Sequence, residues 1–151
     1  MIEKEFVTFR LAGRLFGVEA EGVQDVFHPR QITRIPLAPA EILGILNLRG
    51  RIVTAICLRQ KLAAGDRPAG APEPKALGVE VQGDAYGLVV DDVEGVLKLS
   101  EADMIPPPDN LPPRWRDVVR GVHRLPDELL VLFDLKRLLH ADQASTPGVA
   151  A

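Results

Sequence analysis

The sequence predicts an all-β fold with short helices, built as two five-stranded barrels that are related by internal duplication. Apolar residues alternate with polar ones at a period of two over many short runs, which indicates β-strands. Tight turns that contain glycine join neighbouring runs, which indicates hairpins. The pattern also occurs twice, and each copy offers about five short strands, too few for a sandwich but enough for a small closed barrel.

The duplication is visible when the chain is aligned with itself. Residues 44–62, GILNLRGRIVTAICLRQKL, lie over residues 121–139, GVHRLPDELLVLFDLKRLL. Residues 16–26, FGVEAEGVQDV, lie over residues 86–96, YGLVVDDVEGV, in the same order along the chain. These two matches imply a duplicated unit of about 65 to 75 residues. The period is too long and the copies are too few for a solenoid repeat protein.

The first copy begins with a hairpin. Apolar and polar residues alternate over 7–11, the turn AGR follows, and residues 16–20 continue the alternation. The apolar spacing over 23–27 then predicts a short helix, which Pro29 ends. Residues 52–58 are apolar on both faces and predict a buried central strand, which places Cys57 in the interior.

The second copy repeats this order. Residues 77–81 and 86–90 alternate on either side of the turn QGD and predict the equivalent hairpin. The run 128–133 predicts a second central strand. Leucines at helical spacing close both copies, over 58–62 and 135–139, the latter behind Asp134 as its N-cap.

The proline- and glycine-rich segments of the chain predict how it is divided into domains and linkers. We expect one domain over residues 4–140, with a first barrel at 4–62 and a second barrel at 76–140. The proline- and glycine-rich residues 63–75 predict a linker between the barrels. Residues 141–151, ADQASTPGVAA, lack any periodic apolar pattern and are expected to be a disordered tail.

Composition excludes several classes of protein. The net charge of −3 gives no electrostatic reason to expect nucleic-acid binding. A single cysteine excludes an intramolecular disulfide and fits a reducing compartment. No apolar run approaches the roughly 18 residues that a spanning helix needs. We therefore expect a cytosolic protein that reaches a membrane only through partner molecules.

Catalytic constellations are absent from the sequence. Cys57 lies in an apolar run, which predicts an inert thiol rather than a nucleophile. Asp91 and Asp92 are adjacent, so on a strand they face opposite sides and cannot act as a carboxylate pair. The three histidines lack metal-ligand spacing, and no phosphate-binding glycine motif occurs. We expect no enzyme activity, no cofactor and no metal site.

The turn at Arg49 and Gly50 poses a question, because it lies between two apolar runs. In one interpretation Gly50 supplies a positive φ and Arg49 is merely solvated. In the other, Arg49 binds a partner carboxylate or carbonyl group beside an apolar wall. The second copy has Pro126 and Asp127 at the same turn, so the two copies differ in chemistry at this point.

Several segments of the chain follow a known family pattern: NLRG followed by an apolar strand and LR, then FRLAGRLFGVEAEGVQDV, ITRIP, YGLVVDDVEGVLKL and LVLFDLKRLL. Through these segments the chain resembles the CheW family, the coupling proteins of bacterial chemotaxis. The resemblance covers roughly residues 4 to 140. It implies two SH3-like five-stranded barrels with pseudo-twofold symmetry, in agreement with the duplication.

The resemblance also implies a non-enzymatic scaffold. Proteins of this family bridge the cytoplasmic hairpin tips of chemoreceptors to the histidine kinase CheA, whose regulatory domain has the same double-barrel fold, and such bridges build rings or arrays. Carried over by motif, the receptor-binding residues are Asn47, Arg49 and Gly50 of NLRG, Val23, Asp25 and Val26 of the VQE[IV]-like segment, and Gly87 of the second copy.

Two departures from the family pattern affect these expectations. Thr54 and Cys57 replace a proline and an aspartate, so the first short helix loses an N-cap that Asp134 keeps in the second copy. Asp25 stands for a glutamate, which keeps the charge but shortens its reach. The alternative function is an SH3-like module that binds a different peptide or protein partner outside chemotaxis, because small barrels host many functions.

Overall fold

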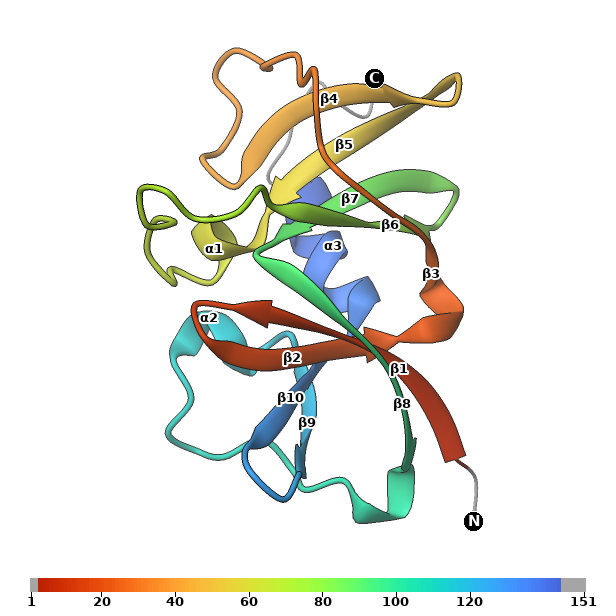
Figure 1. The fold of residues 1–151 in the computed structure, drawn as a ribbon, viewed down its shortest axis with the longest axis vertical. Coiled ribbons are helices and arrows are strands. Elements are labelled where there is room, and N and C mark those ends of the chain that lie inside the picture. Colours follow the sequence, from red (N-terminus) through yellow and green to blue (C-terminus); the bar gives the residue numbers. More distant parts are fainter. Residues whose placement is uncertain (1–2, 145–151) are drawn as a thin grey trace.

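Ten strands in two five-stranded sheets make up the described part of the protein, which supports the all-β prediction with short helices (Figure 1). The computed structural model describes residues 3–144, with side chains up to residue 139. The first sheet has the order β8-β1-β2-β10-β9 and the second the order β3-β6-β7-β5-β4. The strands are β1 (Glu3–Leu11), β2 (Arg14–Glu19), β3 (Val23–Phe27), β4 (Ile42–Leu48), β5 (Arg51–Cys57), β6 (Lys75–Val81), β7 (Asp84–Val90), β8 (Asp92–Ser100), β9 (Val119–Arg124) and β10 (Leu129–Phe133).

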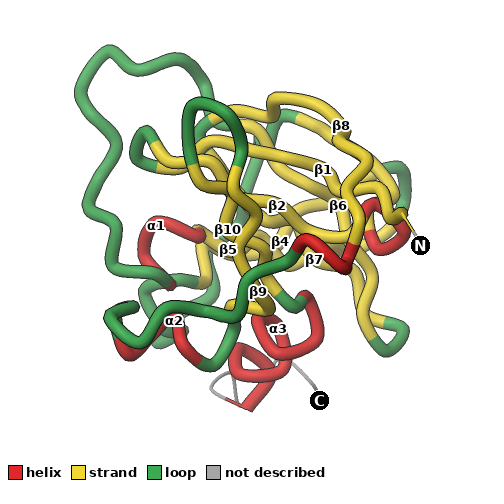
Figure 2. The backbone as a smooth tube through the Cα atoms, turned by 90° about the horizontal axis from the view of Figure 1, so that it is seen from below, coloured by secondary structure: helices red, strands yellow, loops and turns green. Residues whose placement is uncertain are grey.

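Short helices connect and cover the strands. Two single turns of 3₁₀-helix, η1 (Ala20–Gly22) and η2 (Glu101–Asp103), follow β2 and β8. Three α-helices, α1 (Leu58–Lys61), α2 (Pro113–Arg116) and α3 (Leu135–Ala144), gather toward one side of the strands (Figure 2). No helix between residues 3 and 144 has the length and apolar character that crossing a membrane requires.

Each sheet combines strands of both copies, so the expected barrel limits of 4–62 and 76–140 are wrong. The hairpin β1–β2 of the first copy pairs with β8, β9 and β10 of the second, and the hairpin β6–β7 pairs with β3, β4 and β5. The reason lies in the connections. The chain leaves the sheet after the second strand of each hairpin, through η1 in one copy and through Asp91 alone in the other.

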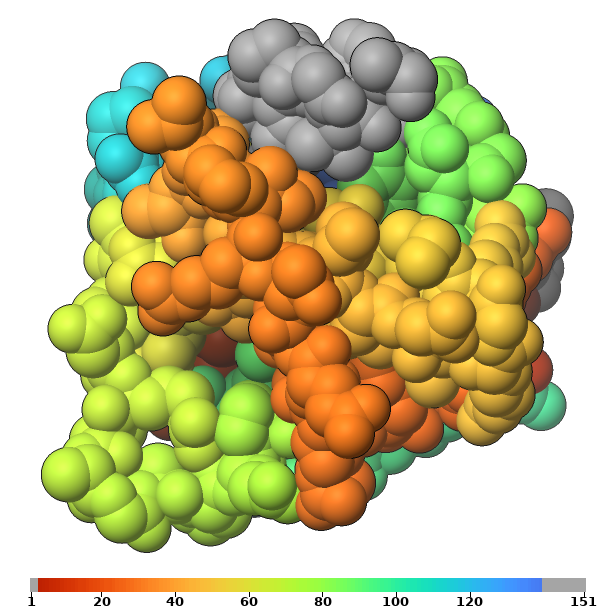
Figure 3. All heavy atoms as spheres, turned by 90° about the horizontal axis from the view of Figure 1, so that it is seen from above, coloured from red at the N-terminus to blue at the C-terminus, as the bar shows by residue number. Residues whose placement is uncertain are grey.

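The two barrels are nonetheless related as the duplication predicts. A parallel pair joins β10 to β2 in one and β5 to β7 in the other. Each barrel is closed by an isolated bridge to its last strand. Thr33 and Ile45 exchange hydrogen bonds of 2.7 and 2.9 Å, and Ile105 and Val122 exchange two of 2.8 Å. The first of these bridges holds the segment 28–41 against β4 (Figure 3).

Three apolar clusters follow from this arrangement. One fills the barrel around Phe6, and one fills the barrel around Leu46. The largest lies between the sheets and takes residues from both copies, including Phe9, Leu88 and Phe133. Side chains that alternate along each hairpin therefore face a barrel interior on one side and the shared core on the other.

Some local expectations were wrong. Residues 23–27 form β3 rather than a helix. Cys57 is partly exposed, because it is the last residue of β5 and faces away from the buried Ile56. Residues 141–144 belong to α3 rather than to a disordered tail, whose remaining residues 145–151 lie outside the described part of the chain.

The segment 63–75 is also more than a spacer. It is anchored by hydrogen bonds from Arg59 to two of its carbonyls and by the ion pair of Arg30 with Glu73. Other local predictions are confirmed: α1 and α3 follow β5 and β10. Asp134 caps α3 by accepting a 3.2 Å hydrogen bond from the Arg137 N–H, whereas Cys57 gives α1 no side-chain cap.

His123 on β9 lies buried in the barrel around Phe6, only 4% exposed, with its Nε2 atom lacking a hydrogen-bond partner among the described residues. The repeat places it at the position of Leu46 in the other barrel. Burial lowers the pKa of His123, although the charge of Asp103 opposes this change. The folded state therefore favours the neutral imidazole, and the unfolded state takes up more protons below about pH 6.5.

We predict that His123→Leu stabilises the protein, by about 1 kcal/mol at pH 7.5 and by more at pH 5.5. Stability associated with the neutral histidine is present above its unfolded pKa and falls as the pH drops below it, and leucine removes this dependence. Urea unfolding at the two pH values measures the effect. His28→Gln, at an exposed histidine, serves as the control, and an equal gain at both pH values would contradict the explanation.

Candidate functional site

The turn between β4 and β5 is a two-residue hairpin turn with left-handed backbone at both positions. The φ angles are 53° at Arg49 and 84° at Gly50, and the Asn47 Oδ1 atom accepts a 2.8 Å hydrogen bond from the Gly50 N–H. Such turns favour asparagine or glycine at both positions, since a residue with a Cβ atom in this region costs about 1 to 2 kcal/mol. Turn geometry therefore explains Asn47 and Gly50 but not Arg49.

Arg49 forms an ion pair with Asp25 of β3, through its Nη1 atom and the Oδ2 atom of the aspartate. The structure thus brings together two predicted site residues that are far apart in the sequence. The arginine side chain is 74% exposed and that of Asp25 25% exposed. Exposed pairs of this kind add little to folding stability. The pair instead holds a cationic head at the surface in a defined place.

Two exposed apolar side chains occur on the strands next to this pair. Val26 follows Asp25 on β3, and Ile52 is opposite Asn47 in the β4–β5 register. Large exposed apolar residues beside a fixed charge are typical of a protein-binding surface. We call Asp25, Val26, Asn47, Arg49 and Ile52 the hairpin surface. Sequence reasoning missed Ile52, because its run was expected to be buried on both faces.

The remaining predicted site residues lie elsewhere. Val23 is partly buried and packs against the core between the sheets. Gly87 is buried on β7, and a Cβ atom built there would approach the Phe27 ring to 3.1 Å and Val53 to 3.5 Å. The absence of a side chain at Gly87 makes room for Phe27 inside the barrel. Its effect on any surface contact would be indirect.

A polar cluster supports the hairpin surface from the adjoining strands. Glu80 of β6 accepts hydrogen bonds from Arg51 at 2.9 Å and from Gln24 at 3.1 Å. These bonds lower the pKa of Glu80, that from Arg51 most strongly. They connect the start of β5 to β3 across the sheet.

The other barrel has an equivalent polar cluster, in which an arginine stands at the position of the glutamate and a glutamate at the position of the arginine. Arg10 on β1 makes two 2.7 Å hydrogen bonds to the carboxylate of Glu128 and a further bond to Glu94. By the repeat, these three residues correspond to Glu80, Arg51 and Gln24. The exposed residues Val96 and Leu129 likewise correspond to Val26 and Ile52. The two barrels thus present equivalent apolar residues at equivalent positions.

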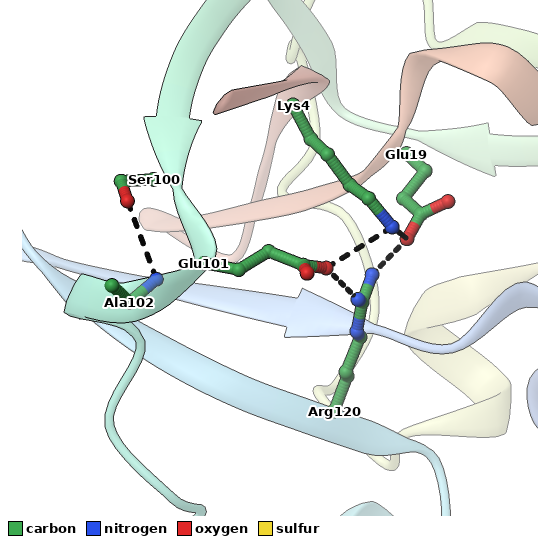
Figure 4. A network of polar contacts seen from close by, with 6 residues as sticks. All are labelled: Lys4, Glu19, Ser100, Glu101, Ala102 and Arg120. Atoms are coloured by element: carbon green, nitrogen blue, oxygen red, sulfur yellow. Dashed lines mark hydrogen bonds and ion pairs between the residues drawn. The ribbon is translucent and has the colours of Figure 1, made fainter. Parts of the chain in front are cut away.

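A second network joins β1, β2, η2 and β9 (Figure 4). The Lys4 ammonium lies 3.1 Å from Glu101 and 3.4 Å from Glu19, and Arg120 pairs with both carboxylates. The hydrogen bond with Glu101 is the main reason why the pKa of Lys4 is raised, and it likewise lowers the pKa of Glu101. With two cations and two carboxylates, the network is internally neutral and tethers η2 to the sheet.

No group of three or more potential metal ligands occurs among residues 3–139. The chemistry of the described site is that of a binding surface: a fixed arginine, a partly buried carboxylate and exposed apolar side chains. Such a surface suits a helical or hairpin partner that offers both apolar and acidic or carbonyl groups.

The chain is similar to known proteins over most of its length. The model of the CheW-like domain matches residues 5–143. Chemotaxis protein CheW of Klebsiella aerogenes is 32% identical over 143 residues, which cover 94% of this chain and 85% of that protein. Chemotaxis protein CheW of Treponema pallidum is 27% identical over 146 residues, which cover 92% of this chain and 84% of that protein.

The crystal structure of the scaffolding protein TtCheW from Thermoanaerobacter tengcongensis superposes with a TM-score of 0.81 at 32% identity. The match covers 91% of this chain and 88% of that one. A family model, two relatives and a solved structure that each match most of the chain lead to one conclusion. The chain belongs to the CheW-like domain family.

Proposed function

We propose that this protein is a non-enzymatic chemosensory scaffold that couples the cytoplasmic hairpin tips of chemoreceptors to a CheA-type histidine kinase. Membership of the CheW-like family supports the general role of a chemotaxis scaffold. The hairpin surface is the observation that carries the more specific proposal, because Arg49 occupies a turn position that backbone geometry does not favour and is paired with Asp25, while β3 and β5 expose Val26 and Ile52. In this role the protein works in the cytoplasm, at membrane receptor arrays that it reaches through its partners.

The hairpin surface is our candidate for the receptor contact. A receptor tip is a helical hairpin, and an apolar helix face can cover Val26 and Ile52 while its carboxylate or carbonyl groups accept hydrogen bonds from Arg49. Asn47 and Gly50 act by shaping the turn, and Asp25 by placing the guanidinium. Val23 and Gly87 act from the core side, by supporting β3 and by making room for Phe27.

The kinase contact is assigned to the opposite barrel. Val96 and Leu129 are exposed there, at positions equivalent to those of the receptor contact. The charges beside them, on Arg10, Glu94 and Glu128, are already paired with one another. A domain of like fold can therefore dock through apolar residues, and because each chain carries two barrels, alternating chains would close into rings or arrays.

This assignment predicts how the contact responds to salt. Binding of the purified CheA regulatory domain should have a dissociation constant on the order of micromolar and lose less than tenfold in affinity between low salt and about 0.5 M salt. Titration calorimetry measures both values. Leu129→Gln should weaken kinase binding by about tenfold while leaving receptor binding unchanged, since it removes buried apolar area.

The matched control is Ile52→Gln, the equivalent change on the hairpin surface, which should weaken receptor binding and spare kinase binding. Loss of affinity beyond tenfold in high salt, or absence of kinase binding at either salt concentration, would count against the arrangement. So would equal effects of Leu129→Gln and Ile52→Gln on both partners.

A further inference from the structure

One ion pair is largely buried. Arg59, 8% exposed at the start of α1, donates to both carboxylate oxygens of Asp91 at 2.7 and 2.6 Å. The Ala12 N–H donates to the same carboxylate at 2.9 Å. A loop covers the pair, since the remaining Arg59 nitrogen donates to the carbonyls of Gly65 at 3.3 Å and Asp66 at 3.0 Å.

The covering loop also carries a cation, Arg67, whose charge acts on the carboxylate. Burial raises the pKa of Asp91. The hydrogen bonds from Arg59 and Ala12 and the charges of Arg59 and Arg67 lower it by more, so the net change is downward. Arg67 acts on Asp91 through its charge alone, because its Nη2 atom donates to the Pro72 carbonyl. The sequence of this loop, residues 63–70, is AAGDRPAG.

The repeat assigns each residue of this filled site a counterpart in the other half of the chain. The counterparts lie around an open cavity. Arg59 corresponds to Lys136, Asp91 to Glu21 and Ala12 to Gln82. These three counterparts all line a cavity of about 580 Å³, beside Phe133 and Leu135. The largely buried ion pair of one half is thus replaced by a hollow in the other.

The charged groups of the cavity are not equally engaged. Glu19 and Arg120 belong to the network of Figure 4, and Glu80 is bonded to Arg51. Lys136 and Glu21, the equivalents of the largely buried pair, form no hydrogen bond or ion pair with any described residue.

The chain after each short helix explains the difference. In the first copy α1 ends at Lys61, and left-handed residues at Ala63 and Gly65 turn the loop back over Arg59. In the second copy α3 continues from Leu135 to Ala144. As far as residue 144, α3 therefore leads away from Lys136, whereas the loop of the first copy folds back over Arg59.

We propose that this cavity binds a glycine-containing turn of a partner protein, which presents backbone carbonyls to Lys136 and an arginine to Glu21. The occupant is inferred from the filled site, where residues 65 and 66 supply the carbonyls and Arg67 adds a positive charge that acts on Asp91. Residues 141–151 of this chain contain neither lysine nor arginine, so they lack the cation that such a turn would need. The cavity uses none of the residues of the hairpin surface, so this inference stands apart from the proposed function.

The probe is the acetylated and amidated octapeptide AAGDRPAG, followed by amide chemical shifts of the labelled protein. It should bind with a dissociation constant on the order of millimolar and shift the amides of residues 20–22, 81–82 and 134–137. Replacement of its arginine by glutamine, or Glu21→Gln in the protein, should each weaken binding by about threefold, as expected for a partly exposed charge pair. Lys136→Gln should have a similar effect, whereas Glu41→Gln, at a carboxylate outside the cavity, should not.

Three results would overturn the proposal. One is the absence of shifts up to about 10 mM peptide, a concentration well above the expected dissociation constant. Another is a shift pattern centred on Arg59 and Asp91, which would mean that the peptide competes for the filled site. The third is binding that is indifferent to Glu21→Gln and to the loss of the peptide arginine.

Discussion

Arg59→Leu should lower the free energy of unfolding by about 3 kcal/mol, the largest change in folding stability that we expect from a single substitution here. Leucine leaves the partly buried Asp91 carboxylate with the Ala12 N–H as its remaining hydrogen-bond donor, and it leaves two loop carbonyls without Arg59. Urea unfolding at pH 7 measures the loss.

The same pair gives a pH signature. The pKa of Asp91 is lowered in the folded protein, so its contribution is present above the unfolded pKa of about 3.9 and is lost as the pH falls through the folded value. The wild-type protein should therefore lose stability in this acidic range more steeply than Arg59→Leu. Equal acid dependence of the two proteins would contradict this part of the explanation.

Two further variants separate the cost of an unpaired charge from that of general disruption. Lys75→Ala removes the exposed pair with Asp92, whose atoms lie 2.8 Å apart, and should cost less than about 1 kcal/mol. The double variant Arg59→Leu/Asp91→Leu should recover part of the loss, because no charge remains buried without a partner. If Arg59→Leu proved as stable as Lys75→Ala, the pair of Arg59 with Asp91 would contribute little to stability.

The barrels could be predicted from sequence because alternation and turn chemistry are local. Their strand composition could not, since equivalent strands of the two copies carry the same pattern. Nothing in residues 7–11 indicates whether they pair with β3 or with its counterpart β8. The choice follows from short connections such as Asp91, whose geometry appears only in the folded protein.

The error at β3 has a local cause. A β-bulge between Val23 and Asp25 shifts the pairing with β6. The extra residue interrupts the period of two and leaves Val23 and Val26 three positions apart, as on a helix face. Its counterpart in the other barrel occurs where β8 meets β1, between Thr8 and Phe9, so comparison of the two copies offered a signal.

The candidate binding site could be predicted only in part from the sequence, for a similar reason. The importance of Arg49 came from its family resemblance, and its partner Asp25 lies on a strand that the sequence did not reveal. Gly87 was expected at a binding surface, but it makes room for Phe27 inside a barrel. Motif position alone does not distinguish a residue that touches a partner from one that shapes the surface beneath.

Arg49→Ala should weaken binding of a receptor signalling hairpin by about 10- to 100-fold, because a charge-assisted hydrogen bond that becomes buried in a complex contributes roughly 1.5 to 3 kcal/mol. The fold should be unaffected, since the side chain is 74% exposed and its pair with Asp25 adds little to stability. Titration with the receptor hairpin, beside a thermal melt, measures both. Arg51→Ala on the same hairpin, which removes an arginine paired with Glu80, should change receptor binding by less than about threefold.

A charge exchange decides what Arg49 does. In the double variant Asp25→Arg/Arg49→Asp the pair can form in reverse, and aspartate tolerates the left-handed backbone at position 49. If the arginine only held β3 and the turn together, this variant would bind the receptor like the wild type. We expect it to stay impaired by at least about tenfold, because the cation would then project from β3 and the turn would offer an acceptor where the receptor requires a donor. Restored binding in the double variant would mean that Arg49 has only a structural role. A folded Arg49→Ala protein with unchanged affinity would mean that the hairpin surface does not contact the receptor.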